Sequence, residues 1–182
     1  MYGPKGIGAL YVRRRRPRIA IHPLLEGGAH ERGLRSGTLN VPAIVGFGSA
    51  AKICRYEMED DMQRTGALRN RLWNGLRDRV PGLAINGSTA HRLPHNLNVR
   101  VEGVEGETLL VGLDDVAVSS GAACTSANPE PSHVLRALGL SEQQARVSIR
   151  FGLGRWNTEA EVDYVVDKVS RLVVRLREIA SD

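Results

Sequence analysis

The residue with the clearest potential for chemistry is Cys124, which lies in the stretch SSGAACTSANPEPSHV, residues 119–134. This stretch is rich in small and turn-forming residues, a composition typical of a loop between packed elements. A cysteine on a loop can move and, as a thiolate, can act as a nucleophile. The residues alone leave two alternatives open, a reactive thiol and an incidental exposed one.

Other residues that could do chemistry favour structural roles. Cys54 lies in the helical stretch AAKICRYEMEDDM, so we expect a small buried hydrophobe. The two cysteines form no C-x-x-C motif and indicate neither a zinc site nor a redox pair. We expect no metal site, because the histidines lack metal-ligand spacing and suit surface or capping roles: His22, His30, His91, His95 and His133. Four acids lie in or beside the segment GETLLVGL, and we interpret them as helix-end charges rather than catalytic pairs: Glu105, Glu107, Asp114 and Asp115.

Length and composition indicate a globular protein with a real core. The chain has 182 residues, of which 42% are hydrophobic and 25% charged. No apolar run is long enough to span a bilayer and no secretory signal is present, so we expect a cytoplasmic protein without a membrane partner. The net charge of +5 is partly due to RRRRPR, residues 13–18. Because no aromatic residues are interleaved there, we interpret it as a solvated turn and expect no nucleic-acid partner.

The strands and helices that position Cys124 are predicted from the hydrophobic periodicity and from the capping and proline residues at their ends. Short strands are expected at 6–12 and 18–24, followed by a helix that Asn40 caps and Pro42 opens. A second helical pattern ends at Pro81, and we place a domain boundary near residue 57, between the two helical segments.

Beyond this boundary, strand-like segments alternate with helical ones, which indicates an α/β or α+β class. A helix is expected to begin at Pro131 and end at Gly139. Thr158 and Glu161 have capping-box spacing before a helix with one broad apolar face. The expected strands are 83–86, 96–101, 116–119 and 146–151.

Five segments together resemble one enzyme family. SSGAACTSANPEPSHVLRALGL resembles the active-cysteine loop of cysteine desulfurases, pyridoxal-phosphate-dependent (PLP-dependent) enzymes related to the class V aminotransferases. Four other segments resemble further signatures of this family, in the family's order: YGPKGIGALYVRRR, GGAHERGLRSGTLNVPAIVGFG, LPHNLNV and SIRFGLGR. The resemblance implies the α/β fold of PLP-dependent transferases, fold type I. Residues 1–57 would be the end of the large PLP-binding domain, and residues 58–182 the small C-terminal domain.

The resemblance also implies roles for three residues. Cys124 matches the nucleophile that takes sulfur from PLP-bound L-cysteine as a persulfide, with release of L-alanine. Arg150 matches the arginine that binds the substrate carboxylate. Thr38 matches the residue that hydrogen-bonds the PLP phosphate, usually of the partner subunit, which implies a homodimer. The sulfur would pass to an acceptor or scaffold protein, for iron-sulfur clusters and thiolated cofactors.

The main departure from the family concerns the Schiff-base lysine. In the family this lysine directly precedes the hydrophobic residue of [hydrophobic]-YGPKG, and here that residue is Met1. We therefore expect that the Schiff-base lysine is not present and that the chain alone is inactive. Three smaller departures replace small residues by other small ones: Ala29, Ala122 and Gly152. Two hypotheses stay open, the C-terminal part of a desulfurase, and a non-catalytic fragment or half of a split protein that presents Cys124 to a partner.

Overall fold

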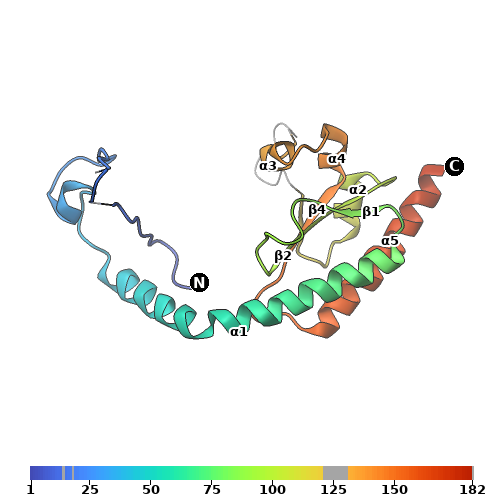
Figure 1. The fold of residues 1–182 in the computed structure, drawn as a ribbon, viewed down its shortest axis with the longest axis horizontal. Helices are drawn as coiled ribbons and strands as arrows, with labels where there is room; N and C mark the ends of the chain where they lie inside the picture. The colour runs from blue at the N-terminus through green and yellow to red at the C-terminus, as the bar shows by residue number, and fades with distance from the viewer. Residues whose placement is uncertain (14, 18, 121–130, 182) are drawn as a thin grey trace. The chain divides into compact units, whose positions relative to one another are not determined.

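A computed structural model describes residues 1–13, 15–17, 19–120 and 131–181 (Figure 1). The chain divides into two compact units, Met1–Met58 and Glu59–Asp182. This division falls beside the expected boundary at residues 57 and 58. No helix in the described part of the chain is long and apolar enough to cross a membrane.

The expected break between two helices near residue 57 is wrong. One helix of 39 residues, α1 (Val41–Arg79), begins in the first unit and ends in the second. The polar run at 55–65 contains neither glycine nor proline, so nothing in it stops a helix. Asn40 caps α1 as predicted, because its Oδ1 accepts a hydrogen bond of 3.2 Å from the backbone N–H of Ala43.

The first unit contains less regular structure than the sequence predicted. The strands expected at 6–12 and 18–24 are absent among its described residues, and apart from α1 it has only the short 3-10 turn η1 (His30–Gly33). Two strands without a covered face are at best marginal in water, and the side chains of Leu10, Tyr11 and Leu24 are largely exposed. Cys54 is half-buried, which corrects the expectation of a fully buried residue.

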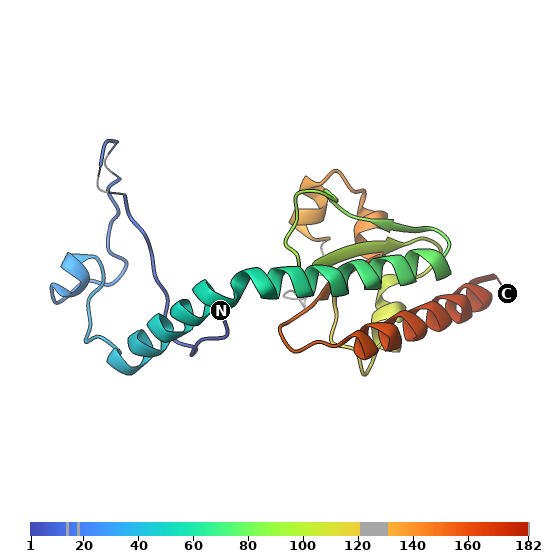
Figure 2. The ribbon, with the colours of Figure 1, turned by 60° about the horizontal axis from the view of Figure 1, so that its bottom comes forward.

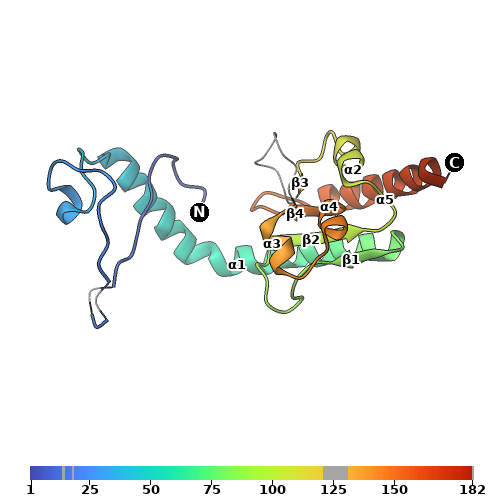
Figure 3. The same cartoon turned by 90° about the horizontal axis from the view of Figure 1, so that it is seen from above.

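The second unit contains a four-stranded sheet with the order β1-β2-β4-β3 (Figure 3). All neighbouring strands are antiparallel, so this unit is of the α+β kind rather than an alternating parallel one. The strand predicted at 96–101 is confirmed, whereas the one predicted at 116–119 is shorter and begins later. The strands are β1 (Leu83–Ile85), β2 (Asn96–Val101), β3 (Ser119–Ser120) and β4 (Ser148–Gly152).

Two long helical segments cover one face of this sheet. In Figures 1 and 2 the second half of α1 and α5 (Glu159–Ser181) run side by side along it. The predicted capping box of α5 is confirmed, because Thr158 N–H donates to Glu161 Oε2 and Glu161 N–H donates to Thr158 Oγ1. The core combines buried residues of both layers: Leu68, Leu72, Leu76, Leu97, Val99, Val101, Ile149, Phe151, Val162, Val166, Val169 and Val173.

Short helices complete the unit. α2 (Gly106–Gly112), α3 (His133–Ala137) and α4 (Glu142–Arg146) connect the strands. In Figure 1, α3 and α4 lie on the opposite side of the sheet from α1 and α5. Among the described elements, α3 and α4 lie on this second face of the sheet (Figure 1), and the same face carries the candidate site.

Candidate active site

Arg150 lies in the middle of β4, on the face of the sheet that points away from the core. Its neighbours Ile149 and Phe151 are buried, whereas Arg150 is exposed. In the strand register Arg150 is opposite Asn98 of β2 and Ser119 of β3. Arg150 makes no ion pair with any residue that the structure describes. A cation without an acidic partner on a polar face suits the binding of an external carboxylate, which a guanidinium can hold by two parallel hydrogen bonds.

A buried asparagine, Asn86, fixes the strands around Arg150. Its Nδ2 donates to Asn98 Oδ1 at 2.6 Å and to Ser148 Oγ at 2.9 Å. Its Oδ1 accepts from Arg100 Nη1 at 3.0 Å. Asn98 is the cross-strand neighbour of Arg150, and Ser148 precedes it by two positions on the same strand. Asn86 thus ties together the residues that border Arg150 on two strands.

Arg92 lies in the loop between β1 and β2 and hydrogen-bonds the backbone of this loop, including that of Asn86. Its Nη2 donates to the carbonyl of Asn86 at 3.0 Å and its Nε donates to the carbonyl of Ser88 at 2.7 Å. Partial burial, followed by the nearby charge of Arg69, lowers the pKa of Arg92 from its usual value. An arginine pKa is so high that Arg92 stays cationic, so its role is to hold carbonyl groups and not to move protons.

Three residues of this network were not predicted from the sequence as site residues: Asn86, Arg92 and Arg100. A signal was present in β2, where Asn96, Asn98 and Arg100 alternate with buried Leu97, Val99 and Val101. A period of two predicts one polar and one apolar face. The role of Asn86 had no such signal, because it depends on contacts with two other strands.

Cys124 lies outside the described residues, but both ends of its segment are anchored in the second unit. The segment follows β3 and precedes α3, whose predicted end at Gly139 is confirmed. Gly139 has a φ of +83°, and the N–H groups of Gly139 and Leu140 bond back to Arg136 and Leu135 in a Schellman pattern. Cys124 follows Ser119 by five residues. Ser119, the residue from which this count starts, is the strand partner of Arg150.

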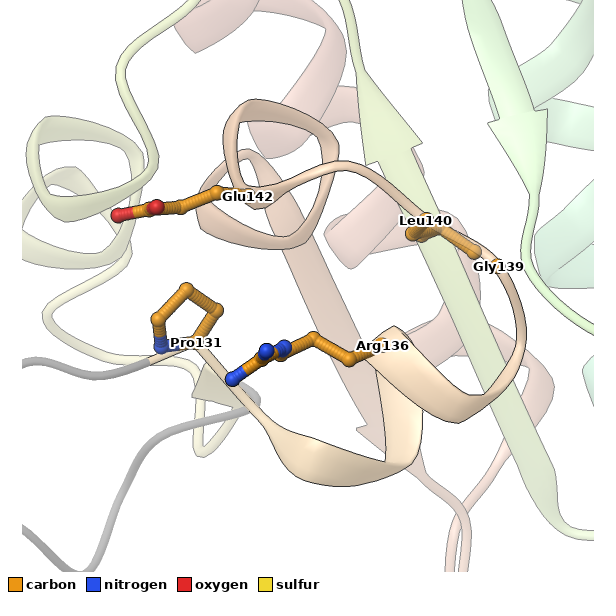
Figure 4. A pocket seen from close by; sticks show the side chains of 5 residues that line it. All are labelled: Pro131, Arg136, Gly139, Leu140 and Glu142. Carbon is orange, nitrogen blue, oxygen red and sulfur yellow. The ribbon is translucent and has the colours of Figure 1, made fainter.

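A hollow of about 440 Å³ lies between α3 and α4, beside the first described residue after this segment. It is lined by Pro131, Arg136, Gly139, Leu140 and Glu142. Figure 4 shows the side chains of Arg136 and Glu142 on the same side of the ribbon as Pro131. The lining has one cation and one anion but no nucleophile, so we assign no catalytic role to this hollow.

Thr38 lies in the first unit, in the loop that precedes α1, and its side chain is exposed. Arg35 Nη1 donates to the carbonyl of Gly37 at 2.8 Å, which holds the turn. Gly37 has a φ of +107°, a conformation that glycine adopts without strain. The hydroxyls of Ser36 and Thr38 flank this glycine, and hydroxyl and backbone N–H groups are the donors that a phosphate group needs. The residues present thus fit the phosphate end of a PLP molecule.

Lys168, one of the chain's three lysines, is occupied by two carboxylates. Its Nζ donates to Asp114 at 2.7 Å and also to Asp115, which accepts a further hydrogen bond from Tyr164. These contacts raise the pKa of Lys168 and lower the pKa values of both aspartates. Lys168 is therefore held in its charged form, which is unsuited to forming a Schiff base. The two aspartates follow α2, where the sequence led us to expect helix-end charges.

The histidines occupy the surface positions that the sequence predicted. All five are exposed: His22, His30, His91, His95 and His133. Within the described ranges, no three His, Cys, Asp or Glu side chains lie close enough together to hold a metal ion.

Comparisons with known proteins extend over nearly the whole chain. The family model Aminotransferase class-V matches residues 1–165. "Cysteine desulfurase IscS" of Anaeromyxobacter sp. (strain Fw109-5) is 59% identical over 180 residues, which are 99% of this chain and 44% of the relative. The protein of the same name from Pasteurella multocida (strain Pm70) is 56% identical over the same shares. A solved structure titled "NIFS-LIKE PROTEIN" is similar with a TM-score of 0.74 and 35% identity, over 88% of this chain and 41% of that one. The chain thus spans less than half the length of these relatives.

Proposed function

Because this chain belongs to the class-V aminotransferase family, we propose that it is the C-terminal, sulfur-accepting part of a cysteine desulfurase. The expected fold class, fold type I of the PLP-dependent transferases, is confirmed by the similarity to NifS-like structures. The proposed reaction converts L-cysteine to L-alanine and leaves the sulfur on the protein as a persulfide. The observation that carries the proposal is the cation of Arg150, which has no ion-pair partner in the described part of the chain and lies on the sheet face beside β3, the strand that leads to Cys124.

In the proposed reaction two residues of this chain act on the two ends of L-cysteine. Arg150 binds the carboxylate with its guanidinium. The thiolate of Cys124 attacks the substrate sulfur, so that an S–S bond forms and the substrate C–S bond breaks. The electron pair of the broken bond stays with the substrate carbon, which takes up a proton and leaves as L-alanine. Bound PLP supplies the electron sink that makes this bond cleavable.

We propose that Ser36 and Thr38 bind the phosphate of PLP, with Thr38 acting on the partner subunit's cofactor in a homodimer. We also propose that none of the lysines of this chain forms the Schiff base. Lys168 is engaged by Asp114 and Asp115, and Lys5 matches a different lysine of the family. The chain by itself would then be inactive, although it carries the nucleophile.

The sulfur bound to Cys124 would be transferred to an acceptor or scaffold protein, for iron-sulfur clusters and thiolated cofactors, in the cytoplasm. A segment between a strand and a helix suits such a transfer, because the sulfur has to be collected at one place and delivered at another.

The experiment is a chimera in which this chain replaces the matching 180 residues of the Anaeromyxobacter relative. We expect release of L-alanine and, with dithiothreitol, of sulfide from L-cysteine, whereas the chain alone releases neither. Cys124→Ser should abolish both products, and Cys54→Ala, the control on the other cysteine, should leave them unchanged. Arg150→Ala should raise KM by about 10-fold to 100-fold, since a hydrogen bond to a charged group contributes about 1.5–3 kcal/mol.

Two results would contradict the proposal. Undiminished sulfide release by the Cys124→Ser chimera would exclude Cys124 as the nucleophile. A folded, PLP-loaded chimera without turnover would favour the alternative, a non-catalytic chain that presents Cys124 to a partner.

A further inference from the structure

The sheet register places a serine directly beside Arg150. β3 pairs antiparallel with β4, with Ser119 opposite Arg150 and Ser120 opposite Ile149. Ile149 is in the core, and side chains alternate between the faces of a strand, so Ser119 shares the polar face with Arg150 and Ser120 does not. Directly opposed residues on one face have Cβ atoms about 4.5–5.5 Å apart, which is within reach of an arginine side chain.

The hydroxyl of Ser119 is buried and has no hydrogen-bond partner among the residues that the structure describes. Buried hydroxyls are nearly always hydrogen-bonded, so an unpartnered one has room for an ordered water or for a donor that approaches it when a ligand binds. On the other side of Arg150, Asn98 Oδ1 already accepts from Asn86. Asn96 Oδ1 is also without a partner, but Asn96 pairs with Gly152 and is only a diagonal neighbour of Arg150. Within the described ranges, Ser119 Oγ is therefore the unengaged side-chain oxygen directly across from Arg150.

We propose that Ser119 is a positioning residue, whose Oγ accepts an N–H of Arg150 when the guanidinium binds a carboxylate. A guanidinium has five N–H donors, and a bidentate carboxylate occupies two of them. A hydrogen bond from one of the remaining donors to a fixed strand holds the plane of the guanidinium. This inference rests on the proposed role of Arg150 in binding the substrate carboxylate.

The kinetic test uses the chimera and L-cysteine. Ser119→Ala should raise KM about tenfold with little change in kcat, because a ground-state binding interaction is lost. Ser119→Thr, which keeps the hydroxyl, should restore most of the affinity. Ser120→Ala is the matched control, the same substitution on the next residue and the opposite face. In a chimera that already carries Arg150→Ala, Ser119→Ala should not raise KM further, because Ser119 acts through Arg150.

A second measurement does not depend on turnover. The full chain with ¹⁵N-labelled arginine is titrated with sodium acetate, and the Nε–H signal of Arg150 is followed by NMR. Ser119→Ala should weaken acetate binding about tenfold and Ser120→Ala should not change it. If the chimera is inactive but this difference is found, the proposed function fails and the inference stands. Equal acetate affinity in wild type and Ser119→Ala, or equal losses in the Ser119 and Ser120 variants, would overturn the inference.

Discussion

Replacing Asn86 tests whether one buried side chain holds the sheet of the second unit together. Asn86 is 4% exposed, and its amide makes three side-chain hydrogen bonds, to Asn98, Ser148 and Arg100. Truncation to alanine removes all three and leaves their partners in places that water enters poorly.

The expected loss in the free energy of unfolding follows from the three hydrogen-bond partners of Asn86. Two of the bonds join neutral groups, worth about 1 kcal/mol each, and the third comes from a guanidinium, worth about 1.5–3 kcal/mol. Asn98 and Arg100 are half-buried and can regain some hydration, which reduces the sum. We therefore expect Asn86→Ala to lower the free energy of unfolding by about 3 kcal/mol, and the melting temperature by roughly 10 °C.

The assay is urea unfolding of the chain, followed by tryptophan fluorescence. Both tryptophans, Trp73 and Trp156, lie in the second unit, and Trp73 packs against its core. Asn70→Ala, an exposed asparagine on α1, is the matched control and should change the free energy by at most about 0.5 kcal/mol. If Asn86→Ala is no less stable than Asn70→Ala, the network is not what holds these strands, and the reasoning fails.

Two further predictions concern helix packing and charge. Gly66→Ala should stabilise the chain by up to about 1 kcal/mol, because an added Cβ meets only an ordinary contact at 3.8 Å. Gly75→Ala should destabilise the chain, because the added Cβ would lie 2.8 Å from Val166. The melting temperatures of both variants test this, and equal changes in melting temperature would refute the packing argument. Lys168→Met should lower stability most between about pH 5 and pH 10. The depressed pKa values of Asp114 and Asp115 contribute stability above about pH 4 that is lost as they are protonated, and the raised pKa of Lys168 contributes stability that is lost only at alkaline pH above its usual value. A difference from wild type that is constant from pH 2 to pH 11 in urea unfolding would contradict this.

The sequence predicted those elements that are determined locally. The cap of α1 at Asn40, the capping box of α5 at Thr158 and the end of α3 at Gly139 each depend on side chains within a few residues, and each is confirmed. β2 was predicted because its apolar and polar residues alternate with a period of two.

The errors arise where the outcome depends on distant contacts. The pattern at 6–12 is strand-like, but a strand forms only with a partner, which the described residues of the first unit do not provide. The continuity of α1 was missed because its polar middle was interpreted as a boundary, although polar helix-forming residues continue a helix as well as apolar ones. For the candidate site, a family resemblance selected Arg150, whereas Asn86 and Ser119 emerged only from the strand register.

The strand register links the stability of this unit to its chemistry. A slip of one residue in β4 would move Arg150 into the core and Ile149 to the polar face, because the side-chain period is two. β3 is only two residues long and cannot fix this register by itself. Asn86 can, since its backbone N–H donates to the carbonyl of Asn98 at 2.9 Å while its amide bonds the side chains of Asn98 and Ser148. Asn86 is thus a buried polar residue beside an apolar core, and its hydrogen bonds favour one strand register. It keeps the single cation of β4 on the face where a carboxylate can approach.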